Sequence, residues 1–346
     1  AKQAEVEVPQ EIIAALAKKG ANASLSINVN GTEYRIPASL MTVPGPVKVS
    51  IVSPGAADAA SVETLFKGRE VLADPLLFKL EQINADKTTT ELKHFGKTHV
   101  SEFVTVDAKK INVKRATGVV YIPGTHELRS VPTLFKVNAD GTVTVEIKKT
   151  GSGIYALIQQ DIRFSDAIPS WAREDVAQAA AKLIVSGESN GSFGGDQHIS
   201  RAEIISIVVK ALGILPDDSN SNFKDVDPKS RYAREIAAAK AAGLVKGRSG
   251  DTFDPNSLIT REELAVMLSN VLNYSGKKNE ASQGMLNQFK DHSKISSYAK
   301  LSVAFVVEQK IMQGVSASKL DPQSHVTKAQ TVVTVMRLLR AVGLSN

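Results

Sequence analysis

The pattern of hydrophobic positions changes character once along the chain, near residues 158–163. Before this point, apolar and polar residues alternate in short runs rich in β-branched side chains, which is typical of strands with one buried face. Such runs occur at residues 24–29, 47–52, 99–106, 111–122 and 143–147. After it, apolar residues recur at helical spacing. The chain is therefore predicted to be multidomain, with a mainly β, sandwich-like domain over residues 1–158 and a mainly α second part.

Glycine-containing turns separate the predicted strands, at residues 30–31, 123–124 and 138–141. One short helix is expected at Pro9–Lys19, with the proline in its first turn and Gly20 as its stop. Residues 72–83 are apolar enough for either a helix or a strand. The last two runs, 141–147 and 151–156, are expected to pair as a closing hairpin.

The second part repeats one pattern three times, and a fixed repeat defines an architecture. The copies span residues 164–214, 223–274 and 289–342, which we call modules 1, 2 and 3. Each begins with Phe-x-Asp, passes an aromatic-alanine pair and a glycine, and reaches a basic residue fourteen positions after that glycine. The equivalent residues, in module order, are Asp166, Asp225 and Asp291; Trp171, Tyr232 and Tyr298; Gly187, Gly247 and Gly314; and Arg201, Arg261 and Lys328.

The motif around each basic residue predicts the start of a helix. Ser or Thr precedes the basic residue, and Glu or Gln follows three positions later, which is a capping box. The three pairs are Ser200 with Glu203, Thr260 with Glu263 and Thr327 with Gln330. Modules 1 and 2 add a hydrophobic staple, whereas module 3 has Thr331 at the apolar position.

The basic residue itself is not explained by helix formation. It occupies the first helical position, where the positive end of the helix dipole disfavours a cation. We therefore expect an anion nearby, because free amides at a helix start and a guanidinium together suit a carboxylate. The alternative is an intermodule salt bridge, for instance to Asp166, Asp225 or Asp291.

The other repeated residues also allow two interpretations. The aromatic residues could stack on sugar rings or pack beneath the first helix; the question is open for Trp171, and packing is favoured for Tyr232 and Tyr298. Each aspartate could cap that helix or accept a bond from a ligand hydroxyl. Gly187, Gly247 and Gly314 are interpreted as helix stops with positive φ that keep a loop free of side chains. Five phenylalanines are assigned to the core: Phe164, Phe193, Phe223, Phe253 and Phe289.

This threefold pattern resembles the S-layer homology (SLH) modules of bacterial cell-surface proteins. The resemblance implies three modules around a pseudo-threefold axis, with pyruvylated secondary cell-wall polysaccharide held in grooves between neighbours. It implies that the basic residues face the groove that takes the pyruvate-bearing sugar, and we take all four sets of equivalent residues given above as candidate polysaccharide-binding residues. Module 3 departs from the pattern, with Lys328 and Gln330 in place of Arg and Glu. Lysine lacks the planar fork for bidentate carboxylate binding, so the groove of Lys328 is expected to be the weakest.

Composition adds little to this picture. The net charge of +6 divides evenly between the two parts, so nothing favours nucleic acid as a partner. The absence of cysteine leans towards an exported bacterial protein without disulfides. No apolar stretch is long enough for membrane insertion, and the first residues do not resemble a signal peptide, as expected of a mature form. The expected location, the bacterial cell wall or S-layer, rests on the repeat.

Candidate catalytic chemistry is sparse. No nucleophile elbow, phosphate loop or zinc-protease motif occurs. His94 and His99 lack a third metal ligand at a recognisable spacing and are interpreted as loop or strand-edge residues. We therefore expect a non-catalytic anchor without metal or cofactor. The rival hypothesis is an exported polysaccharide-active enzyme that uses the repeats as its wall anchor, and a third possibility is self-association of the β part in a surface lattice.

Overall fold

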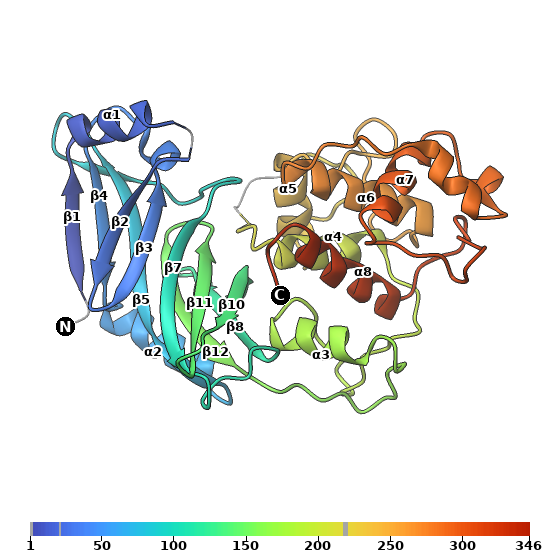
Figure 1. The fold of residues 1–346 in the computed structure, drawn as a ribbon, viewed down its shortest axis with the longest axis horizontal. Coiled ribbons are helices and arrows are strands. Elements are labelled where there is room, and N and C mark those ends of the chain that lie inside the picture. The colour runs from blue at the N-terminus through green and yellow to red at the C-terminus, as the bar shows by residue number, and fades with distance from the viewer. Residues whose placement is uncertain (1–2, 21, 217–220) are drawn as a thin grey trace. The chain divides into compact units, whose positions relative to one another are not determined.

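The computed structural model describes residues 3–20, 22–216 and 221–346. The chain divides into two compact units. The first comprises the residues up to Asp161 with two short segments, Ala181–Leu183 and Gly213–Leu215. The second comprises the remainder, from Ile162 onwards. Figure 1 shows strands in the first unit and helices in the second.

Two antiparallel sheets build the first unit. In the described residues, one sheet has the order β1-β4-β5-β12-β8-β9, with β6 paired to β5, and the other has the order β10-β11-β7-β3-β2. The strands of the first sheet are β1 (Ala4–Val8), β4 (Val47–Val52), β5 (Glu70–Ile83), β12 (Gly153–Gln159), β8 (Ala116–Tyr121), β9 (Leu128–Val131) and β6 (Thr89–Glu91). Those of the second are β10 (Thr133–Val137), β11 (Thr142–Lys149), β7 (Val100–Asp107), β3 (Thr32–Pro37) and β2 (Ser24–Val29).

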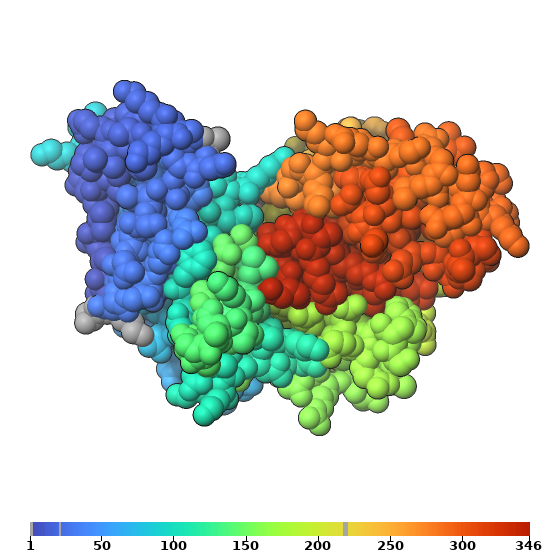
Figure 2. All heavy atoms as spheres, viewed as in Figure 1, coloured from blue at the N-terminus to red at the C-terminus, as the bar shows by residue number. Residues whose placement is uncertain are grey.

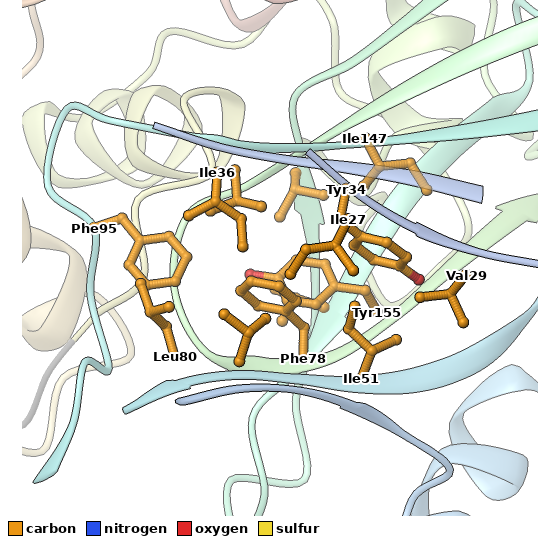
Figure 3. Close-up of a cluster of buried hydrophobic side chains, with 14 of the residues drawn as sticks. Ile27, Val29, Tyr34, Ile36, Ile51, Phe78, Leu80, Phe95, Ile147 and Tyr155 are labelled. Atoms are coloured by element: carbon orange, nitrogen blue, oxygen red, sulfur yellow. The ribbon is translucent and has the colours of Figure 1, made fainter. Parts of the chain in front are cut away.

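The two sheets share one hydrophobic core. Figure 3 shows apolar side chains from both sheets pointing toward one another. Tyr34 of β3 stacks on Phe78 of β5, with ring centroids 6.2 Å apart and planes 6° from parallel. The inward residues alternate with outward polar ones, as the sequence pattern predicted. Residues 72–83 form a strand, because they lie within β5.

The prediction of a closing hairpin is wrong. β11 pairs with β10 and β7, whereas β12 pairs with β5 and β8 in the other sheet. The short connection after Lys149 therefore carries the chain from one sheet to the other. Gly151 in this connection forms a bridge with His94, and a Cβ there would lie 2.1 Å from the Lys93 carbonyl oxygen. Close backbone approach, rather than a tight turn, explains this glycine.

Helices of the first unit are short. The predicted one is α1 (Gln10–Lys18), which begins one residue later than expected because Pro9 is its N-cap. A second helix, α2 (Ala56–Phe66), was not predicted from the sequence and buries Val62 and Phe66. A single-turn 3₁₀ helix, η1 (Ala38–Met41), follows β3.

A buried ion pair interrupts the apolar core of the first unit. Lys149 continues the inward-facing positions of β11 and is 1% exposed. Its Nζ lies 2.7 Å from Oε2 of Glu102, and the Tyr34 hydroxyl donates to Oε1 of Glu102 at 2.9 Å. The same Nζ lies 3.7 Å from the ring centroid of Tyr155. Burial lowers the pKa of Lys149, and the Glu102 carboxylate opposes this shift.

The second unit contains two principal helices per module. They are α3 (Arg173–Ala181) and α4 (Arg201–Ala211), α5 (Ala233–Ala241) and α6 (Arg261–Tyr274), and α7 (Lys300–Glu308) and α8 (Lys328–Ala341). Two 3₁₀ helices, η2 (Gln283–Gln288) and η3 (His292–Lys294), lie near the start of module 3. In Figure 2, atoms of module 3, in orange and red, lie against those of module 1, in yellow-green.

Candidate functional site: the junctions between modules

Each predicted capping box is present at the start of α4, α6 and α8. The side-chain oxygens of Ser200, Thr260 and Thr327 accept from the backbone N–H groups of the third helical residues. The Glu or Gln side chain accepts in return from the N-cap amide. The helices therefore begin where the sequence predicted, because this motif is local.

The first two amides of each of these helices are bound by the next module. Arg201 and Ala202 donate to the carbonyl oxygens of Ser257 and Pro255 at 2.9 and 3.0 Å. In the same way Arg261 and Glu262 donate to Ser324 and Pro322, and Lys328 and Ala329 donate to Gln197 and Gly195. We call these contacts the first, second and third junctions. The expectation of free amides is wrong, because backbone carbonyls already satisfy them.

The junctions close a ring. Module 1 docks on module 2, module 2 on module 3, and module 3 on module 1. Isolated β-bridges repeat this order, joining Ser200 to Leu258, Thr260 to His325 and Thr327 to His198. Each helix start therefore depends on a loop of the following module.

The three aspartates hold these docking loops in place. Asp225 accepts from the amides of Phe253 and Asp254 at 2.8 and 2.6 Å. Asp166 accepts likewise from Phe193 and Gly194, and Asp291 from Leu320 and Asp321. Neither expected role, helix cap or acceptor of a ligand hydroxyl, describes these bonds. The carboxylate is used instead to bridge two successive amides of the loop that receives the preceding helix.

These hydrogen bonds favour the charged form of each aspartate. The amide of Phe193 is the main cause that lowers the pKa of Asp166. Burial acts in the opposite direction on Asp225 and Asp291, but amide hydrogen bonds still lower the pKa of both carboxyls.

The glycines are needed for close packing rather than for positive φ. Gly187, Gly247 and Gly314 are absent from the residues with positive φ, so that prediction is wrong. A Cβ on Gly247 would lie 2.7 Å from the Thr252 carbonyl oxygen and 3.2 Å from the Phe223 ring. A Cβ on Gly314 would lie 2.4 Å from a carbonyl oxygen and 2.9 Å from a carbon of the Phe289 ring. The helix ends with positive φ lie earlier, at Leu183, Gly243 and Lys310.

The three cations reach the residue immediately before the glycine of the next module. Nη2 of Arg201 donates to the Lys246 carbonyl oxygen at 2.9 Å, and Nη2 of Arg261 donates to that of Gln313 at 2.7 Å. Nζ of Lys328 lies 3.4 Å from the Ser186 carbonyl oxygen. The cations of the first and third junctions also lie over an aromatic ring of the next module, Phe253 and Phe193 respectively.

Salt bridges to the three aspartates, which were examples of the alternative interpretation, are not formed between the described residues. Within the described parts of the chain, neither Arg201 nor Arg261 has an ion-pair partner within 4 Å. Lys328 pairs with Glu188 of module 1 at 3.1 Å, so the alternative of an intermodule salt bridge holds at the third junction. Burial lowers the pKa of both arginines, and at the first junction the neighbouring Arg248 lowers that of Arg201 further.

The first junction has an additional feature that the other two do not share in the described chain. The buried Nε–H of Arg201 has no hydrogen-bond partner among the described residues. In contrast, Nε of Arg261 donates to the Leu320 carbonyl oxygen at 2.8 Å. A buried N–H group without an acceptor costs free energy, so a ligand that places an acceptor at this junction would bind favourably.

The aromatic residues are more exposed than the core interpretation predicted. Trp171 is 56% exposed and Tyr298 is 62% exposed, whereas Tyr232 is half-buried. The Tyr298 hydroxyl donates to the buried Glu262 at 3.1 Å; burial and this carboxylate raise the pKa of Tyr298 to about 12. The core assignment is therefore wrong for Tyr298. Four of the five phenylalanines are buried, while Phe164 is half-buried and packs on Phe193.

The described residues contain no group of three or more His, Cys, Asp or Glu side chains that could hold a metal ion. His94 is exposed, and His99 is half-buried immediately before β7. Of the helices described, none combines the length and apolar character that crossing a membrane requires.

Comparison with known families identifies the threefold repeat. A sequence model of the S-layer homology domain matches residues 163–205, 222–265 and 288–332. The chain contains three S-layer homology domains. Its SLH domains begin within one residue of the three modules, and each match includes the Asp, the glycine and the basic residue of its module.

The relatives of this SLH protein include enzymes as well as structural proteins. The chain is 28% identical over 242 residues to an amylopullulanase of Thermoanaerobacterium thermosulfurigenes, covering 69% of the chain and 13% of the relative. It is 28% identical to an exoglucanase of Acetivibrio thermocellus, over 53% and 17% of the two chains. It is 30% identical to a surface-layer 125 kDa protein of Lysinibacillus sphaericus, over 51% and 14%. The chain thus spans less than a fifth of each of these relatives.

The amylopullulanase match reaches beyond the repeats. Its 242 residues exceed the distance from residue 163 to the C-terminus, so the similarity extends into the β-rich unit. The SLH domains and the surface-layer relatives place the protein outside the cell, at the bacterial cell wall.

Proposed function

We propose that the SLH protein is a non-catalytic anchor that binds pyruvylated secondary cell-wall polysaccharide at the junctions between its modules. SLH domains attach proteins to the cell wall. The proposal adds which polysaccharide is bound and where on the protein it binds. We assign modules 1–3 to one binding domain with pseudo-threefold symmetry, because the junctions connect the modules in a ring. In this proposal the β-rich unit has no catalytic role.

The observation that carries the ligand assignment is the unmet donor of Arg201. This guanidinium is buried at a junction, it has no ion-pair partner among the described residues, and its Nε–H lacks an acceptor. A pyruvate ketal would supply a carboxylate, which forms a strong charge-assisted hydrogen bond with a guanidinium. The exposed Trp171 and Tyr298 would offer apolar faces to sugar rings.

Two measurements test the anchor and its ligand. Purified wall sacculi should pellet the full chain, and sacculi stripped of the secondary polymer should not. Calorimetry should show that a disaccharide carrying one pyruvate ketal binds far more tightly than the same disaccharide without the ketal. Equal pelleting with stripped sacculi would contradict wall-polymer anchoring, and equal affinities would contradict carboxylate recognition.

One finding favours a second function. The similarity to the amylopullulanase extends into the β-rich unit, so this unit could belong to a polysaccharide-active enzyme anchored by the SLH domains. Release of reducing sugar from soluble polysaccharides by the full chain would support this alternative. Self-association in a surface layer is a third proposal, supported by the surface-layer relatives, and sedimentation of the full chain at increasing concentration tests it.

A further inference from the structure

The residue that follows the glycine of each module occupies the same backbone position in all three. These residues are Glu188, Arg248 and Val315. Each donates its N–H to the carbonyl oxygen four residues later, at 2.7, 3.0 and 2.8 Å respectively. The residue two positions before each one provides the carbonyl that the cation of the preceding module approaches. The fold therefore places one acid, one base and one apolar residue at the same position of the three junctions.

At the third junction the acid neutralises the cation. Nζ of Lys328 lies 3.1 Å from Oε1 of Glu188, and the Lys328 side chain is only 13% exposed. A second carboxylate, Asp166, lies close enough that Lys328 contributes to its lowered pKa. An incoming carboxylate would meet the negative charge of Glu188 and compete with it for the same ammonium group.

At the first junction the same position adds a cation. Arg248 is held by ion pairs to Asp254 at 3.1 Å and to Glu263, and it lies near enough to Arg201 to lower the pKa of that residue. At the second junction Val315 is 49% exposed and brings no charge. Two of the three junctions thus lack an acid at this position.

We propose that the residue after the glycine sets the charge specificity of each junction, and that Glu188 closes the third junction to acidic saccharides. Arg248 and Val315 leave the first and second junctions open to them. This inference rests on the proposed binding of pyruvylated saccharide at the junctions. The sequence-based expectation of a weak third site rested on the lysine itself. In this inference Lys328 can bind a carboxylate once Glu188 no longer pairs with it.

Calorimetric titration of the full chain with a disaccharide that carries one pyruvate ketal tests the inference. Glu188→Gln should add one binding event, or tighten the weakest event at least about tenfold, because repulsion and competition are both removed. Val315→Glu should remove one event from the second junction. Asp251→Asn is the matched control: it removes one negative charge from an exposed pair with Lys224, and should change neither number nor affinity.

The outcomes separate this inference from the function on which it rests. If the wild type binds the ketal and Glu188→Gln leaves the number and affinities of sites unchanged, the specificity role is overturned while the anchor stands. If neither the wild type nor any variant binds it, both are overturned. Thermal melting of Glu188→Gln should remain close to the wild type, because a half-exposed ion pair contributes little stability.

Discussion

Nη2 of Arg261 lies 2.7 Å from the carbonyl oxygen of Gln313, a residue of the next module. Nε of the same side chain lies 2.8 Å from the Leu320 carbonyl oxygen. Arg261, which the sequence suggested as a ligand-binding cation, therefore also links two modules. In the proposed function this guanidinium serves both binding and assembly, so a variant that weakens one is expected to weaken the other.

The first prediction concerns stability. Arg261→Ala should lower the free energy of unfolding by about 3 kcal/mol, because two carbonyls, of which that of Leu320 is buried, lose a charged donor. Arg201→Ala should cost about 1.5 kcal/mol, since it removes one such bond. Lys328→Ala should cost less than about 1 kcal/mol, because its partner Glu188 is half-exposed. Urea unfolding of the full chain, followed by far-ultraviolet circular dichroism, measures all three.

An exposed lysine provides the control for this series. Lys224→Ala removes a cation whose side chain is 79% exposed in its pair with Asp251, and should leave the unfolding midpoint unchanged. Equal losses for Arg261→Ala and Lys328→Ala would show that the arginine contacts do not hold the junction.

The sequence predicted local features well and non-local ones poorly. The capping box of Thr260 and Glu263 could be predicted because its partners are three residues apart and need nothing else. The role of Asp225 could not, because its two amide partners lie 28 and 29 residues away in a loop of no regular structure. For the same reason the bonds from the α4 amides to module 2 were missed, although the repeat itself was evident.

The second prediction concerns the glycines. Gly247→Ala should destabilise the second unit by about 2 kcal/mol or more, because the added Cβ would lie 2.7 Å from a backbone oxygen that cannot move freely. Gly55→Ala is the control, since a Cβ there would meet nothing within 4 Å and its φ is −61°. Thermal melting of both variants measures the difference. A Gly247→Ala protein that melts with the wild type would contradict the packing explanation.

The third prediction concerns the buried pair of Lys149 and Glu102. Lys149→Met should cost about 3–5 kcal/mol, because it leaves the Glu102 carboxylate buried with, among the described residues, the Tyr34 hydroxyl as its one remaining side-chain partner. The double variant Lys149→Met with Glu102→Gln should recover most of this loss, since no unpaired charge remains. Hydrogen exchange of the β7 and β11 amides at increasing denaturant concentration reports on this unit. A double variant as unstable as the single one would indicate that packing, rather than charge, dominates the site.

The fourth prediction is a pH dependence of the β-rich unit. Burial, and then the neighbouring Lys148, lower the pKa of His99 to about 4 from the ordinary value of 6.5. The unfolded chain therefore binds more protons than the folded chain between these values, and stability must fall as the pH falls. The contribution of His99 is fully present above about pH 6.5 and is lost as the pH approaches 4, by about 1–2 kcal/mol after allowing for its partial exposure.

His99→Gln should flatten the stability profile over this interval, whereas the exposed His94→Gln should not. Urea unfolding at half-unit steps from pH 4 to pH 7 measures the slope, and an unchanged slope in His99→Gln would assign the pH dependence to other groups.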